Sequence, residues 1–170
     1  MLIKCYGQFW NPDVIEWGSD RNRPGTLLGV IKKGKRNHTI NFWKAKGIYV
    51  LHANYRAVYV GRANGSSIGA RLRDHLTDRH AGRWDMFSWY SISIPCISRK
   101  DVSRPGQRQL KPEVMVNSLE ALAILIADPA LNRRREKLKD AYEASQPDGA
   151  KPKAIRTYLE EILRKIPESS

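Results

Sequence analysis

The chain has 170 residues, about the size of one ordinary domain, and is long enough to bury a core without disulfides. Its 30 Lys and Arg residues outnumber its 17 Asp and Glu residues, and the net charge of +13 favours a polyanionic partner, above all nucleic acid. The longest apolar run, 121–127, is too short to span a bilayer, and no apolar signal core follows a basic N-terminus. We therefore expect a cytoplasmic protein without a membrane partner.

The first predicted element is a β-hairpin with a basic turn. Residues 26–31 and 38–43 are its expected strands, and Gly34 between them marks the turn. The turn carries the densest basic cluster of the chain, namely Lys32, Lys33, Lys35 and Arg36. A solvated turn and a phosphate contact both remain open for this cluster, since basic side chains position a protein on a polyanion.

A second hairpin and a helix follow. The apolar runs 46–52 and 57–61 are separated by a short polar turn, which predicts a tight antiparallel pair. Ser66 or Ser67 then caps a helix that ends near Thr77.

The rest of the chain alternates between one strand and several helices. Residues 87–94 are rich in aromatic and β-branched side chains and predict a strand. The polar stretch 97–116 predicts a long loop, which we assign to substrate contact because long loops in compact domains are often functional. Helices are expected over 117–128, 132–145 and 153–165.

The order strand, strand, helix, strand, helix indicates one mixed α/β domain with a small sheet. We expect residues 1–45 to form an N-terminal basic extension with a hairpin, 46–132 the core, and 133–170 a C-terminal helical extension.

Two short motifs in the core resemble the signature of the GIY-YIG nucleases: Gly47-Ile48-Tyr49 and Tyr59-Val60-Gly61. Four more residues fall where that family keeps an arginine, a histidine, a metal-binding glutamate and an asparagine: Arg71, His75, Glu120 and Asn132. Valine replaces isoleucine in the second motif, which conserves the shape of the side chain. The resemblance covers about half the chain. It implies an α+β fold in which helices flank a small three-stranded antiparallel sheet.

The same resemblance implies a DNA endonuclease that hydrolyses phosphodiester bonds with one metal ion. The hydroxyls of Tyr49 and Tyr59 would reach the active site, where one of them takes the proton of the attacking water. Because a free tyrosine is a poor base at neutral pH, nearby positive charge must lower its pKa, and Arg62 and Arg71 are candidate sources. Arg71 would also hold the scissile phosphate through its planar fork, and His75 would relay a proton.

Glu120 is the implied ligand of the metal ion, Mg²⁺ or Mn²⁺. Magnesium keeps several waters in its octahedral shell, so one glutamate together with substrate phosphate can hold it. Asn132 would cap the following helix and support the site. The implied partner is duplex DNA, and the protein could be a monomer or a homodimer.

Residue chemistry alone leaves plainer interpretations open. Tyr49 and Tyr59 could be ordinary strand tyrosines, and Glu120 could be an acid favoured in the first turn of a helix. His75 could lie on a helix surface and pair with Asp78.

The sequence does not indicate a zinc site. His75 and His80 lack a matching set of cysteines or histidines. Cys5 and Cys96 are isolated, so buried free thiols are expected rather than a bridge.

Two other functions remain possible. One is an inactive nucleic-acid-binding module with a nuclease-like fold, and the other is a nuclease that acts on RNA or branched DNA. Roles in restriction, phage defence, mobile elements and repair are all open.

Overall fold

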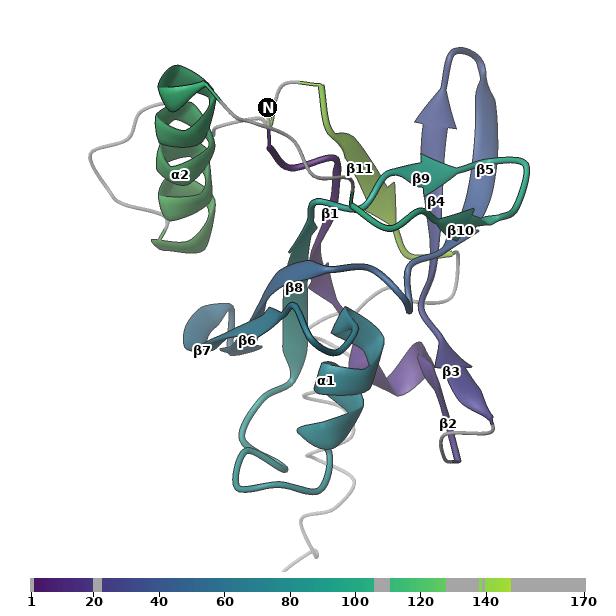
Figure 1. Ribbon diagram of the computed structural model, residues 1–170. Coiled ribbons are helices and arrows are strands. Elements are labelled where there is room, and N and C mark those ends of the chain that lie inside the picture. Colours follow the sequence, from purple (N-terminus) through teal and green to yellow (C-terminus); the bar gives the residue numbers. More distant parts are fainter. Residues whose placement is uncertain (1, 20–22, 106–110, 128–137, 139, 148–170) are drawn as a thin grey trace, which may run out of the picture.

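A computed structural model describes residues 2–19, 23–105, 111–127, 138 and 140–147 (Figure 1). Seven strands form the main sheet: β1 (Cys5–Trp10), β4 (Leu28–Lys33), β5 (Arg36–Asn41), β6 (Gly47–Ala53), β7 (Arg56–Ala63), β8 (Met86–Ser91) and β11 (Tyr142–Ser145). The smaller elements are the 3-10 helix η1 (Pro12–Val14), the helices α1 (Ile68–Asp74) and α2 (Pro112–Ala127), and the pairs β2 (Glu16–Gly18) with β3 (Pro24–Thr26) and β9 (Pro95–Cys96) with β10 (Asp101–Val102).

The main sheet has the strand order β5-β4-β11-β1-β8-β6-β7. Among these described strands, β1 and β11 pair in parallel, with Cys5 beside Tyr142, and the other neighbours pair antiparallel. The sheet therefore combines strands from the N-terminal, central and C-terminal parts of the chain.

The fold class predicted from the sequence is wrong. Of the residues that the structure describes, 42% lie in strands and 20% in helices, so this part of the chain is mostly sheet rather than a small three-stranded sheet flanked by helices. The physical reason is long-range pairing: β1 lies between β8 and β11, so segments expected to be extensions complete one sheet.

The hairpin with the basic turn is confirmed, and both of its strands lie two residues closer to the turn than expected. Lys33 pairs with Arg36, which leaves Gly34 and Lys35 as a two-residue turn. Gly34 has a φ of 62° at the first turn position, a conformation that glycine adopts without strain.

The second hairpin is also confirmed, as β6 and β7. Asn54 and Tyr55 at its turn both have positive φ, 51° and 63°, which is the pattern of a type I′ turn. The next element, α1, is shorter than predicted. It begins after Ser67, whose hydroxyl accepts from the Ala70 N–H, and its C-cap is His75.

Other predictions need correction. The stretch 97–116 is not one long loop, because it contains β10 and the beginning of α2. Residues 142–145 are not helical, since they form the strand β11 between β1 and β4. The helix predicted over 153–165 lies outside the described residues.

The two faces of the sheet are covered by different helices, which Figure 1 shows well apart. Along β6, side chains alternate between the faces as strand geometry requires. Tyr49 belongs to the apolar cluster that includes Leu72 of α1, whereas Val50 belongs to the cluster that includes Ala121 and Leu122 of α2. Within the described part of the chain, neither helix is both long enough and apolar enough to cross a membrane.

Candidate active site

The two motifs lie side by side in the β6–β7 hairpin, with Tyr49 directly opposite Gly61. A Cβ placed on Gly61 would overlap Cζ and the hydroxyl oxygen of Tyr49. The tyrosine ring therefore occupies the space that any other residue would need at position 61. This packing gives a local reason for the spacing between the tyrosine of the first motif and the glycine of the second.

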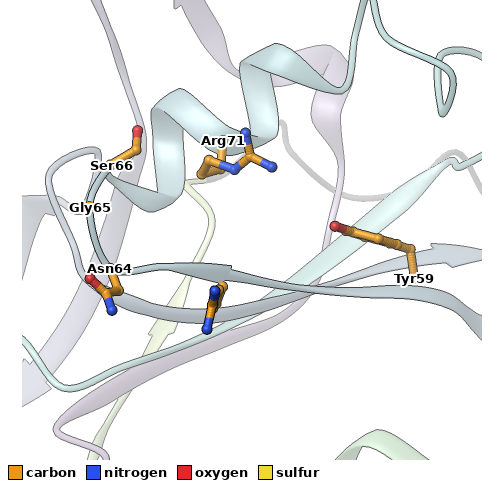
Figure 2. Close-up of a pocket in the computed structure, with 6 residues that line it drawn as sticks. Tyr59, Asn64, Gly65, Ser66 and Arg71 are labelled. Carbon is orange, nitrogen blue, oxygen red and sulfur yellow. The ribbon is translucent and has the colours of Figure 1, made fainter.

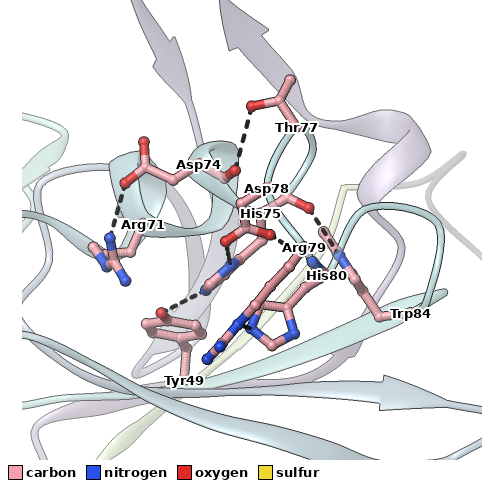
Figure 3. A network of polar contacts seen from close by, with 9 residues as sticks. All are labelled: Tyr49, Arg71, Asp74, His75, Thr77, Asp78, Arg79, His80 and Trp84. Atoms are coloured by element: carbon pink, nitrogen blue, oxygen red, sulfur yellow. Dashed lines mark hydrogen bonds and ion pairs between the residues drawn. The ribbon is translucent and has the colours of Figure 1, made fainter.

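Tyr49, His75 and Asp78 form a chain of hydrogen bonds that runs from the core to the surface (Figure 3). The Tyr49 hydroxyl lies 2.7 Å from His75 Nε2, and His75 Nδ1 lies 2.7 Å from Asp78 Oδ2. An ionised carboxylate accepts hydrogen bonds, so we assign the ring proton of neutral His75 to Nδ1. His75 Nε2 then accepts from the Tyr49 hydroxyl. The pairing with Asp78, the plainer interpretation of His75, is present, although His75 is buried rather than on the helix surface.

Burial controls the acidity of Tyr49. It raises the pKa of the phenol to about 12, and the neighbouring Tyr59 adds to the rise. The Arg71 guanidinium lowers this pKa through its charge and a hydrogen bond, but the effect of burial is larger. Tyr49 is therefore protonated at neutral pH, and it can act as a base only if its own proton moves on to an acceptor such as His75.

A polar pocket of about 430 Å³ adjoins this chain of hydrogen bonds (Figure 2). The residues that line it come from β7, α1 and the turn between them: Tyr59, Arg62, Asn64, Gly65, Ser66 and Arg71. Two planar guanidinium groups in one pocket can donate paired hydrogen bonds to the charged oxygens of a phosphate. Arg71 also forms an ion pair with Asp74, at 3.0 Å between Nη1 and Oδ2.

Tyr59 connects the pocket to the hydrogen-bonded chain. It lines the pocket, and its ring centroid lies 6.2 Å from that of Tyr49 and 5.1 Å from that of His75. On its other side it contacts the His80 ring, at 4.5 Å between centroids. Tyr59 is half-buried and Tyr49 is fully buried, so Tyr59 is the phenol that a bound ligand would meet first.

The structure thus brings together five of the predicted site residues: Tyr49, Tyr59, Arg62, Arg71 and His75. The basic cluster of Lys32, Lys33, Lys35 and Arg36 does not line the pocket and is exposed at the tip of the β4–β5 hairpin.

The two remaining site residues are not part of this group. Glu120 is exposed on α2. The buried side chains of α2 pack with Val50 and Tyr90, on the face of the sheet opposite Tyr49, so the structure does not bring Glu120 to the tyrosines. Asn132 lies outside the described residues.

A different group could hold a metal ion. Donor atoms of His75, Asp78 and His80 all lie within 4.8 Å of one another. Two imidazoles and a carboxylate suit transition metals better than magnesium, which prefers oxygen ligands. From the sequence, Asp78 was expected only as a partner of His75. The spacing of all three residues within six positions was the signal that could have indicated the group.

Comparisons with known proteins add no further assignment. No family model matches the chain, and neither a curated protein nor a solved structure matches it. The resemblance to the GIY-YIG nucleases therefore rests on the sequence motifs alone.

Proposed function

We propose that the chain is a DNA endonuclease that hydrolyses phosphodiester bonds at the pocket beside Tyr59. One observation carries this proposal: Arg62 and Arg71 line a pocket whose third functional side chain, Tyr59, contacts the hydrogen-bonded pair of Tyr49 and His75. Phosphodiester hydrolysis needs positive charge around the phosphate and an acceptor for the proton of the attacking water. The two arginines of the pocket would meet the first need, and the pair of Tyr49 and His75 would meet the second.

The arginines would bind the scissile phosphate. Arg62 is exposed at the pocket and Arg71 projects from α1, so the two guanidinium groups approach a ligand from different elements. A net charge of +13 would draw a polyanion to the protein before these specific contacts form.

The proton of the attacking water would leave through the tyrosines. Tyr59 takes this proton while it gives its own to Tyr49, and Tyr49 gives its proton to His75 Nε2. The Asp78 carboxylate, 2.7 Å from His75 Nδ1, stabilises the imidazolium that results. Arg71 stabilises negative charge on the Tyr49 oxygen during the transfer.

A divalent ion, Mg²⁺ or Mn²⁺, would supply Lewis acidity at the phosphate. Two sets of residues are candidate ligands for this ion. One is Glu120, which the resemblance implies, and the other is the group of His75, Asp78 and His80. Loss of magnesium-dependent cleavage in Glu120→Gln alone would assign the ion to Glu120. Loss in His80→Ala alone, with cleavage that prefers manganese or zinc, would assign it to the histidine group.

The decisive experiment incubates the purified protein with supercoiled plasmid, linear duplex, single strands and RNA, with magnesium, with manganese and with chelator. We expect metal-dependent nicks or breaks in duplex DNA. The double variant Tyr49→Phe with Tyr59→Phe, which keeps both rings, should not cut. If the parent protein cuts none of these substrates with either metal, the enzyme assignment is wrong.

A nucleic-acid-binding module without turnover is the second candidate. It is favoured by the position of Glu120, which leaves the tyrosine pocket without the carboxylate that the resemblance implies. Under this alternative the parent protein would bind DNA in a salt-dependent way and leave every substrate intact. A preference for RNA would appear in the same experiment, and a branched duplex added to the substrates would reveal a preference for branched DNA.

A further inference from the structure

A second pocket adjoins the first. It has a volume of about 500 Å³ and lies between the segment before β6, the beginning of α1 and the β9–β10 hairpin. Its lining residues are Lys44, Lys46, Ser67, Arg99, Asp101, Val102, Ser103 and Arg104. Ser66 lines the first pocket and Ser67 lines the second, so the two share this stretch of backbone as a common wall.

The second pocket is strongly basic. Four of its lining residues are cationic and one is anionic, which leaves a net charge of +3. The single acid, Asp101, is engaged by Lys44, whose Nζ lies 3.2 Å from Oδ2. Val102 is the one large apolar side chain among the lining residues, and it is buried. The pocket therefore offers charge and hydrogen bonds but little surface for an apolar ligand.

The walls of this pocket are tied to the rest of the fold. Lys46 Nζ donates to the Ser66 carbonyl at 2.5 Å, which links the segment before β6 to the wall that the two pockets share. The β9–β10 hairpin is fixed to β5 by a hydrogen bond from the Asn41 N–H to the Lys100 carbonyl, at 2.9 Å. Arg99 and Arg104 flank β10, so the fixed hairpin presents both cations to the pocket.

We propose that this second pocket binds a phosphate next to the reacting one on the same nucleic-acid strand. The proposal rests on the proposed function, which assigns the reacting phosphate to the first pocket. A single phosphate would occupy one pocket and leave the other open, whereas a polynucleotide carries phosphates in a row and can occupy both. Two adjoining basic pockets with a shared wall at Ser66 and Ser67 therefore fit a linear polyanion better than a small anion.

The test is the salt dependence of DNA binding, measured by fluorescence anisotropy with a labelled oligonucleotide in chelator, so that no cleavage occurs. The variant is Arg99→Gln with Arg104→Gln, since both side chains are exposed and their removal should not disturb the core. The control is Arg56→Gln with Arg83→Gln, which removes the same charge from two exposed arginines that line neither pocket.

We expect the plot of log affinity against log salt to become less steep by about 0.7 to 0.9 in the pocket variant, because that is the contribution of the one phosphate that is no longer neutralised. The control should keep the parent slope. An unchanged slope in the pocket variant would overturn the inference, and so would an equal change in both variants, since affinity would then follow net charge alone.

The result is separable from the fate of the proposed function. If the parent protein cuts no DNA but the pocket variant shows the shallower slope, the second pocket still binds a strand phosphate and the enzyme assignment alone fails. If the parent protein cuts DNA and the slope does not change, the second pocket is not on the path of the strand.

Discussion

The residues of the site depend on one another through steric fit as well as through charge. Tyr49 is fully buried and can reach His75 only because position 61 has no side chain. A glycine is therefore as necessary to the hydrogen-bonded chain as the groups that carry its protons.

Gly61→Ala should destabilise the protein by about 1 to 3 kcal/mol, the usual cost of an extra methyl group in a packed core. The new Cβ would overlap the Tyr49 ring and push its hydroxyl away from His75. Chemical denaturation measures the change in the free energy of unfolding. Gly65→Ala is the control, because a Cβ at that position has no neighbour within 4 Å. Equal stability of the two variants would show that the ring does not lie over Gly61.

Tyr49→Phe should reduce DNA cleavage by about a hundredfold to ten-thousandfold, the range typical of a missing general base. The ring and its packing remain, but His75 Nε2 loses its partner, so stability should fall by only about 1 kcal/mol. Rates with plasmid substrate, beside an unfolding curve, separate the two effects. Tyr55→Phe is the control. Because Tyr55 is 60% exposed, this substitution should change neither the cleavage rate nor the stability. Cleavage at the parent rate in Tyr49→Phe would remove this residue from the proton path.

At the scale of elements, α1 and the two hairpins hold the functional side chains in place. With seven residues, α1 is too short to be stable alone, so its position depends on packing. That packing includes Gly69, where a Cβ would overlap the Trp43 ring. Arg71 and His75 are positioned by this close approach and by the Ser67 cap.

The β4–β5 hairpin ends in an exposed basic tip, which we expect to bind phosphate away from the reacting bond. Neutralising Lys32, Lys33, Lys35 and Arg36 with glutamine should make the salt dependence of DNA affinity less steep, by up to about 0.9 for each phosphate that the tip no longer binds. Because these side chains are exposed, thermal stability should change little. Anisotropy titrations at several salt concentrations measure the slope. If the quadruple variant shows the same salt dependence as the parent protein, the tip does not contact the DNA strand.

The sequence predicted those elements whose cause is local. Both hairpins follow from turn residues, and the beginning of α1 follows from a serine cap. The convergence of Tyr49, Tyr59 and Arg71 was implied only by the resemblance to the GIY-YIG nucleases. The pocket wall at Ser66 was not predictable, because it depends on how the segment before α1 folds back onto β7.

On the scale of the whole molecule, the large sheet was not predictable from local pattern. Cys5 pairs with Ser91 on one side and Tyr142 on the other, across most of the chain. In β1, Gly7 leaves room for two indole rings, since a Cβ there would meet Trp10 and Trp89 at 2.5 to 2.6 Å. A glycine beside aromatic residues does not suggest a central strand until its neighbours are known.

Folding stability should fall as the pH rises above about 9. Burial raises the pKa of Cys5 from 9.0 to about 12 and that of Tyr49 from 10.0 to about 12. Between these values the unfolded chain releases protons that the folded protein keeps, so alkali favours unfolding by about 1.4 kcal/mol per pH unit for each such proton. Below pH 9 both groups are protonated in either state and the effect is absent.

Denaturation curves measured from neutral pH to about pH 11 would test this expectation. The variant with Cys5→Ala and Tyr49→Phe should lose less stability over that range than the parent, because it lacks the thiol and the phenol whose protons the folded protein keeps. The same decline in parent and variant would show that other groups cause the alkaline unfolding.

The place of β11 in the sheet has a consequence for the order in which the protein can be assembled. Four residues near the C-terminal end of the described chain join the β4–β5 hairpin to β1 and the strands beyond it. While the ribosome is still translating the chain, these two parts exist without the strand that connects them, and β1 and β4 each expose an unpaired edge. The full sheet can close only after residue 145 has left the exit tunnel. Chains that stop earlier would expose unpaired strand edges, which can form hydrogen bonds with the strands of other chains. Premature termination should therefore yield aggregates rather than shorter folded proteins.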